Sequence, residues 1–104
     1  MEKPKTMSEY LSLVDQAIFE LEELRFSAEY DSEELGQAFS FLDTLEAQMR
    51  KLREQIVNGE YRFGTEDLPF MALAEKQDEY LLPFKPLLRA INYTHRTGLD
   101  TGHG

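Results

Sequence analysis

The chain has 104 residues, of which 41% are hydrophobic and 30% are charged, a composition typical of one small globular domain. The absence of cysteine excludes a disulfide framework, a thiolate metal site and a thiol nucleophile. The formal net charge of −9 disfavours nucleic acid and anionic membranes as partners, since both require a basic surface. No apolar run approaches the roughly 18 residues of a membrane span, and the start lacks the apolar core of a secretory signal. We therefore expect a cytoplasmic protein.

The negative charge is concentrated in the first part of the chain. Residues 1–46 contain twelve Asp or Glu and three Lys or Arg, whereas residues 47–104 contain eight of each sign. The whole net charge therefore arises in the first part. This asymmetry predicts an acidic first helix followed by a nearly neutral body.

A first helix is predicted over about residues 8–29. Thr6 and Glu9 have the spacing of a capping box, and Ser8 is an alternative cap. Apolar residues then recur every three or four positions, which is the pattern of an amphipathic helix. The stripe consists of Tyr10, Leu11, Val14, Ala17, Ile18, Leu21, Leu24 and Ala28.

A second helix is predicted over about residues 33–57. Asp31 and Glu34 repeat the capping-box spacing, and Asn58-Gly59 favours a C-terminal stop. The apolar positions alternate steps of four and three, as in coiled-coil packing: Leu35, Phe39, Leu42, Leu45, Met49, Leu52 and Ile56. Because the joint between the two helices is short, we expect them to form an antiparallel hairpin.

The rest of the chain predicts two shorter helices. The third would begin at Thr65 or Asp67, tolerate Pro69 in its first turn and run to about Leu82. Its apolar face would consist of Phe70, Met71, Ala74, Leu81 and Phe84. After Pro83 and Pro86 interrupt the chain, a last helix over about 86–96 would present Leu87, Leu88 and Ile91 and end at Gly98.

The sequence thus predicts an all-α fold with one helical domain over residues 1–104, and with flexible ends at 1–7 and 98–104. Two short helices offer little surface with which to bury the apolar face of a long hairpin. A dimer would bury any apolar surface that they leave exposed.

The first helix carries a second group of aromatic residues opposite its apolar stripe. The group consists of Phe19, Phe26 and Tyr30, beside Asp15, Glu22 and Glu23. Phe19 and Phe26 are seven residues apart and so lie on one face. Either the two shorter helices cover this face, or it binds a partner. Aromatic anchors inside a polar rim are typical of binding hot spots. We predict a partner-binding face for a protein with a basic patch, or for a second copy of the chain.

A second apolar patch is predicted around Tyr61, Phe63 and Phe70. In one interpretation it plugs the open end of the hairpin. In the other it forms the rim of a groove in which a partner segment docks.

No motif indicates catalysis, a cofactor or a metal. Glu20 and Glu23 share a helical face, but the Glu-x-x-His pairs of a di-iron site are missing. His95 falls on the apolar face of the last helix, where we expect it to pack its ring and cap carbonyls. His95, Asp100 and His103 match no standard metal spacing. We predict no cofactor, no metal and no enzymatic activity.

The predicted function is a small acidic helical protein–protein interaction module: an adaptor, a regulator or a chaperone-like binder. One alternative is a structural homo-oligomer that packs the aromatic face of the first helix on itself. Mimicry of nucleic-acid phosphates by the carboxylates is another, but we favour a solvated helix face that keeps the protein soluble as the explanation of these residues. A small-ligand binder or helical enzyme would need a dry cleft near Tyr61, Phe63 and Tyr80 that holds a shifted carboxylate or His95.

Overall fold

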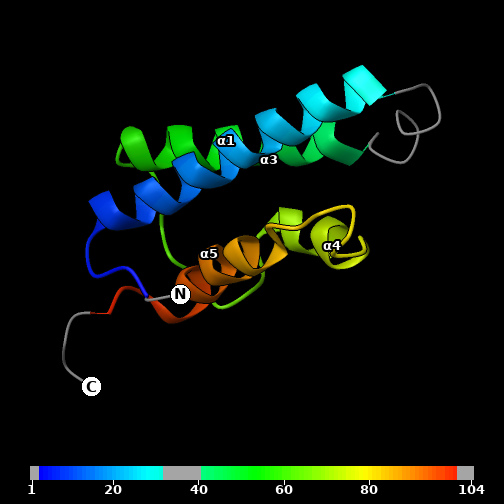
Figure 1. Ribbon diagram of the computed structural model, residues 1–104. Helices are drawn as coiled ribbons and strands as arrows, with labels where there is room; N and C mark the ends of the chain where they lie inside the picture. Colours follow the sequence, from blue (N-terminus) through cyan, green and yellow to red (C-terminus); the bar gives the residue numbers. More distant parts are fainter. Residues whose placement is uncertain (1–2, 32–40, 101–104) are drawn as a thin grey trace.

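The fold is all-α, as the sequence predicts. The computed structural model (Figure 1) describes residues 3–31 and 41–100, and for residues 28–31 it describes the backbone alone. The regular structure within these ranges consists of α1 (Met7–Asp31), α3 (Phe41–Val57), α4 (Pro69–Glu75) and α5 (Lys85–Thr97). Among these helices, none has the length and apolar character needed to cross a membrane.

The predicted capping box starts α1. The backbone N–H of Glu9 donates to Oγ1 of Thr6 at 3.1 Å, and the Glu9 carboxylate accepts the Thr6 N–H at 3.1 Å. These two bonds satisfy N–H groups that a helix start otherwise leaves without acceptors. The predicted stripe supplies the buried residues of this helix: Tyr10, Val14, Ala17, Ile18 and Leu21. Leu11 and Leu24 of the stripe are half-buried, and the Ala28 side chain lies outside the described part of the chain.

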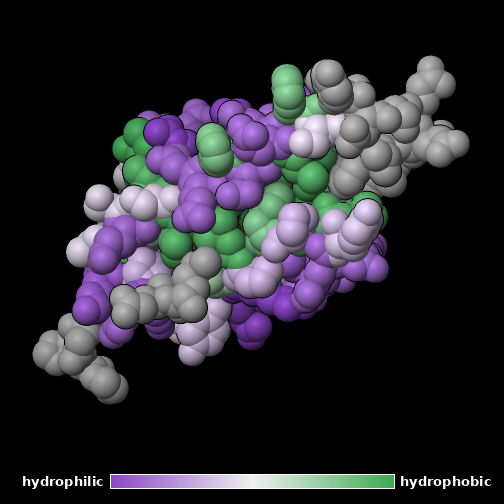
Figure 2. Space-filling view, viewed as in Figure 1, coloured by the Kyte–Doolittle hydropathy of each residue, from purple (hydrophilic) through white to green (hydrophobic). Residues whose placement is uncertain are grey.

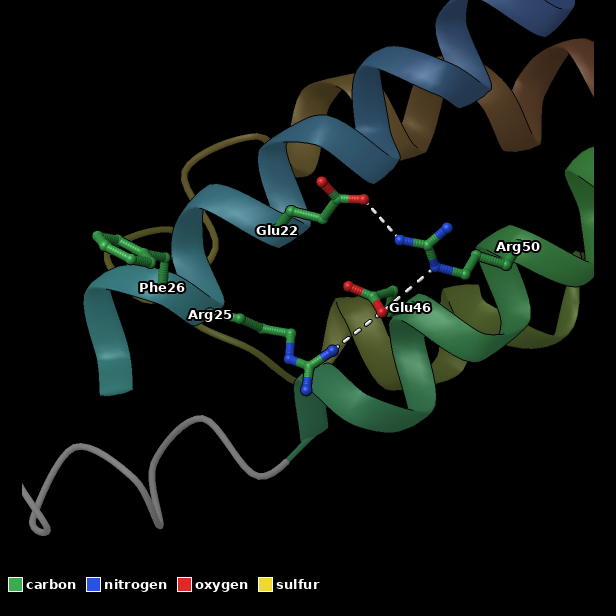
Figure 3. A pocket seen from close by; sticks show the side chains of 5 residues that line it. All are labelled: Glu22, Arg25, Phe26, Glu46 and Arg50. Atoms are coloured by element: carbon green, nitrogen blue, oxygen red, sulfur yellow. Dashed lines mark hydrogen bonds and ion pairs between the residues drawn. The ribbon is translucent and has the colours of Figure 1, made fainter. Parts of the chain in front are cut away.

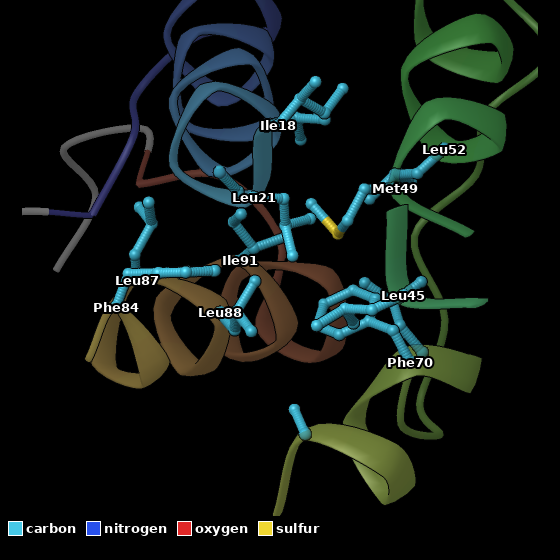
Figure 4. Close-up of a cluster of buried hydrophobic side chains, with 14 of the residues drawn as sticks. Ile18, Leu21, Leu45, Met49, Leu52, Phe70, Phe84, Leu87, Leu88 and Ile91 are labelled. Carbon is cyan, nitrogen blue, oxygen red and sulfur yellow. The ribbon is translucent and has the colours of Figure 1, made fainter. Parts of the chain in front are cut away.

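The four helices of the described ranges form two layers around one core. Helices α1 and α3 lie side by side as the predicted antiparallel hairpin, and α5 and α4 make up the other layer (Figure 1). Helix α1 packs on α3 and α5, while α4 packs on α3 and α5. Figure 4 shows side chains from both layers converging, including Leu21 of α1, Met49 of α3 and Leu88 of α5.

The described part of α3 follows the prediction. The predicted positions 33–40, with the cap at Asp31 and Glu34, lie outside the described residues. From Phe41 onward the stripe is buried at Leu42, Leu45, Met49 and Leu52. Gly59 has a φ of 72°, a left-handed conformation that favours glycine, and its N–H bonds to the Ile56 carbonyl at 3.2 Å. The predicted stop at Asn58-Gly59 is therefore confirmed.

Helix α4 is shorter than predicted, because it ends at Glu75 and not near Leu82. The Lys85 side chain is buried at 6% exposure, and its Nζ donates to the carbonyls of Glu75 at 3.2 Å and Gln77 at 2.8 Å. Asp78 then accepts the N–H of Tyr80 at 2.9 Å, which forms a local turn. An ammonium group thus occupies carbonyls that a longer helix would have bonded internally.

Helix α5 agrees with the prediction within a residue at each end. Leu87, Leu88 and Ile91 are buried, and Gly98, with a φ of 83°, follows the last turn. Beyond it, the N–H of Asp100 donates to the carbonyl of Pro4 at 2.9 Å. The described parts of the two chain ends, both predicted to be flexible, therefore contact each other.

Candidate functional site

The outer face of α1 exposes two aromatic side chains. Phe19 is 58% exposed and Phe26 is 68% exposed. Figure 2 shows mostly hydrophilic side chains over this face, with isolated hydrophobic ones standing among them. Helices α4 and α5 lie on the opposite side of α1, so the explanation in which they cover the two aromatics is wrong. The side chain of Tyr30, the third predicted member, lies outside the described part of the chain.

Two of the three predicted acidic neighbours bind arginines of α3. Asp15 Oδ1 accepts from Nε of Arg53 at 2.6 Å, and Glu22 Oε1 accepts from Nη2 of Arg50 at 2.5 Å. Both pairs cross from α1 to α3. Glu23 is exposed, and the helical rotation of about 100° per residue puts it on the other flank of the aromatic stripe from Glu22.

The pair at Glu22 belongs to a larger network between the two helices. Arg50 also donates a hydrogen bond to Glu46 at 3.3 Å. Arg25 donates to the same Glu46 carboxylate at 2.9 Å and forms an ion pair with Asp43 at 3.0 Å. Figure 3 shows Glu46 between the two arginines. The hydrogen bonds that Arg50 donates to Glu46 and to Glu22 raise the pKa of Arg50. Exposed ion pairs contribute about 0–1 kcal/mol each, and in this network the central carboxylate, Glu46, is only 13% exposed.

A shallow cavity of about 280 Å³ opens beside this network. It is lined by Glu22, Arg25, Phe26, Glu46 and Arg50. In Figure 3 Phe26 points outward from α1, whereas Glu22 and Arg25 point toward α3. The volume is at the lower limit of small-molecule pockets, which span about 300–1,000 Å³, and suits a side chain of a partner protein.

The second predicted patch divides between surface and core. Tyr61 is half-buried and packs edge-on against Phe63 at 5.1 Å between ring centroids, and Phe63 is 37% exposed. Phe70 is 1% exposed, so it cannot form the rim of a groove, whereas its predicted place on the apolar face of the third helix is confirmed. It lies in the first turn of α4, which packs against both α3 and α5, and its ring points into the core (Figure 4).

Tyr61 also joins a buried hydrogen-bond chain. The Tyr61 hydroxyl lies 3.1 Å from the Tyr10 hydroxyl and also forms a hydrogen bond with Nδ1 of His95. The Tyr10 hydroxyl donates to the Ile91 carbonyl at 3.1 Å. The expectation that His95 caps helix carbonyls is wrong, because the ring nitrogen binds Tyr61. Burial raises the pKa of Tyr10 and of Tyr61 and lowers the pKa of His95, with a weaker opposing effect of Asp67 on the histidine. The sequence offers no signal for this series of hydrogen bonds, because the residues that form it come from three separate segments.

Within residues 3–31 and 41–100, no three side chains of the His, Cys, Asp and Glu types are grouped in a way that could hold a metal ion. His103, the second histidine of the sequence, lies outside these ranges.

The protein was also compared with known proteins. The chain matches no protein-family model, no curated protein and no solved structure.

Proposed function

We propose that this protein is a protein–protein interaction module that binds its partner through the outer face of α1. The observation that supports the proposal is the pair Phe19 and Phe26, which are 58% and 68% exposed on the face opposite the buried stripe of the same helix. Large aromatic side chains in a polar surround are the residue type that dominates binding hot spots. The pair therefore gives this face the composition of an interface.

The spacing of the two aromatics defines the shape of the partner surface. Seven residues correspond to nearly two helical turns, or about 10 Å along the axis. An amphipathic helix that presents anchors at positions i and i+7 fits a hydrophobic groove with two pockets. We infer that the partner presents such a groove.

Charge favours a partner with a basic rim. The chain carries a net charge of −9, all of it arising in the segment that contains α1. The side chains of Asp15 and Glu22 remain 46% and 51% exposed within their ion pairs, and Glu23 is exposed on the other flank. A second copy of the chain would bring like charges together, which disfavours self-association through this face. In a complex, the aromatics would supply affinity and the carboxylates would mainly raise the association rate.

The test compares three versions of the protein as bait in a lysate of the native host: wild type, Phe19→Ala/Phe26→Ala, and Tyr80→Ala. Tyr80 is the matched control, because it is an exposed aromatic residue, at 89%, outside α1. Since all three substituted side chains are exposed, circular dichroism should show the same helix content in every version. The captured partner is then purified, and its affinity is measured at low and high salt.

We expect wild type and Tyr80→Ala to retain one partner that the double variant loses, with an affinity at least tenfold weaker for the double variant. Binding should weaken as salt is raised, because the rim is electrostatic. Equal capture by all three versions would contradict the proposal. A concentration-dependent dimer of wild type that the double variant abolishes would favour the homo-oligomer.

A further inference from the structure

A second cavity lies at the loop between α3 and α4 and shares no lining residue with the face of α1. Its volume is about 380 Å³, and its lining consists of Gly64, Thr65, Glu66, Asp67, Leu68, Pro69 and His95. The side chains and backbone of α5 hold this loop in place. Gly64 N–H donates to the His95 carbonyl at 3.1 Å, and Leu68 N–H donates to Oδ1 of Asn92 at 2.8 Å. The cavity wall is therefore fixed by hydrogen bonds to a packed helix.

The hydrogen-bond chain behind His95 fixes where its proton lies. The Ile91 carbonyl can only accept, so the single hydroxyl proton of Tyr10 points to it. The Tyr10 oxygen then accepts the proton of Tyr61, and the Tyr61 oxygen accepts from Nδ1–H of His95. A neutral His95 in this arrangement carries its proton on Nδ1 and a lone pair on Nε2.

Nε2 lies beside the position at which Gly64 lacks a side chain. A Cβ atom added to Gly64 would lie 3.1 Å from Nε2 and 3.4 Å from Cε1 of His95. The φ of Gly64 is not positive, so its backbone conformation does not require glycine. The absence of a side chain instead lets the Gly64 backbone approach the Nε2 edge of the ring more closely than another residue could. Among the described residues, no hydrogen bond uses Nε2.

The charges that line the cavity are negative. Glu66 and Asp67 contribute carboxylates, whereas the lining contains no lysine or arginine. Asp67 forms an ion pair with Arg96, whose Nη1 lies 3.3 Å from Oδ1 of Asp67. Glu66 is exposed. An acceptor nitrogen beside carboxylates favours a ligand group that is cationic and donates hydrogen bonds.

We propose that this cavity binds a small molecule through a primary ammonium group, which donates hydrogen bonds to Nε2 of His95 and to the Glu66 carboxylate. An ammonium group has three donors and no acceptor, so its donors match an acceptor nitrogen and a carboxylate. A carboxylate ligand would be repelled by the carboxylates of the lining and could not donate to the lone pair of Nε2. An alcohol could donate a hydrogen bond but would lack the positive charge. The proposal is independent of the partner-binding face of α1.

The experiment uses three probes with the same three-carbon chain: propylamine, 1-propanol and propionate, each added at constant ionic strength and at pH 7. Two-dimensional NMR of the intact labelled protein follows the backbone resonances of Gly64 and Thr65 and the ring nitrogens of His95. We expect saturable shifts at these sites with propylamine, in the millimolar range, and none with the other two probes. The ring spectrum should show the Nδ1–H form of neutral His95.

Two variants locate the site. Glu66→Gln removes an exposed carboxylate from the lining and should weaken the binding of propylamine at least threefold. Glu60→Gln is the matched control, because Glu60 is also exposed but does not line the cavity, and it should bind as wild type does. Gly64→Ala should abolish binding, because the added methyl group would lie against Nε2. If this variant does not fold, Glu66→Gln decides the question.

Four results would each overturn the proposal. The first two are a neutral His95 protonated on Nε2 and an absence of propylamine shifts at Gly64 and His95. The other two are binding of propionate as tight as that of propylamine and unchanged propylamine binding by Glu66→Gln.

Discussion

The hydroxyl oxygens of Tyr10 and Tyr61 lie 3.1 Å apart, although 51 residues separate them in the sequence. Tyr10 is fully buried in α1 and also bonds to the Ile91 carbonyl of α5, 81 residues away. One phenol therefore joins the first helix, the loop after α3 and the last helix. This junction closes one end of the hairpin onto the second layer of the fold.

Replacing Tyr10 with phenylalanine should lower the free energy of unfolding by about 1–2 kcal/mol. The substitution keeps the ring in the core but removes the donor to Ile91 and the acceptor for Tyr61. Chemical denaturation at pH 7 measures the change. Tyr80→Phe is the control, because Tyr80 is 89% exposed and should unfold as wild type does. Equal stability of Tyr10→Phe and wild type would show that the hydroxyl contributes nothing.

The same junction predicts a loss of stability in alkali. Burial raises the pKa of Tyr10 and of Tyr61 above the ordinary value of 10.0. Above about pH 10 the unfolded chain releases these protons while the folded chain keeps them, so the stabilisation present at lower pH is lost. We expect the free energy of unfolding to fall more steeply between pH 9 and 11 in wild type than in Tyr10→Phe/Tyr61→Phe. Parallel pH dependences in the two proteins would contradict the prediction.

His95 predicts a loss of stability at the acid end. Burial lowers the pKa of His95 in the folded protein below its usual value of 6.5. As the pH falls below about 6.5, the unfolded chain takes up a proton on this ring before the folded chain does, and stability decreases. Between pH 7.5 and 5.5, His95→Gln should therefore lose less stability than wild type. Thermal or urea unfolding at the two pH values measures the difference, and an identical loss would argue against it.

The buried Lys85 should be a strong determinant of stability. Lys85→Met keeps an apolar stem of similar length but leaves the carbonyls of Glu75 and Gln77 without the ammonium donor. We expect a loss of about 1–3 kcal/mol in the free energy of unfolding and faster amide exchange in α4. Lys76→Met, at an exposed position nearby, should be close to neutral. Equal free energies of unfolding for Lys85→Met and Lys76→Met would show that the hydrogen bonds of Lys85 do not stabilise the end of α4.

The difference between prediction and structure is clearest at α4. The apolar residues Phe70, Met71 and Ala74 correctly predicted a helix and its buried face. The same pattern continued through Leu81 and Phe84, so the sequence alone gave no reason to stop at Glu75. At this stop the Lys85 side chain, which comes from α5, donates to the Glu75 carbonyl, a contact that exists only because α4 and α5 pack together.

The candidate site shows the same division. Helical periodicity placed Phe19 and Phe26 on one face opposite the stripe, and this arrangement holds in the structure. Their exposure could not be predicted, because it depends on which side of α1 the other helices occupy. The acidic neighbours were identified by the same periodicity. Their arginine partners, such as Arg53 for Asp15, follow from the register between α1 and α3.

The sequence by itself determined the elements whose signals are local: the capping box of Thr6 and Glu9, the glycine stops at Gly59 and Gly98, and the buried stripes of α1, α3 and α5. Each depends on residues within about two helical turns of one another, so the chain order alone specifies it. Only the tertiary structure decided which face of α1 is exposed, where α4 ends, and that hydrogen bonds link Tyr10 through Tyr61 to His95. These features join residues far apart in the sequence, and their geometry exists only after the two layers have packed.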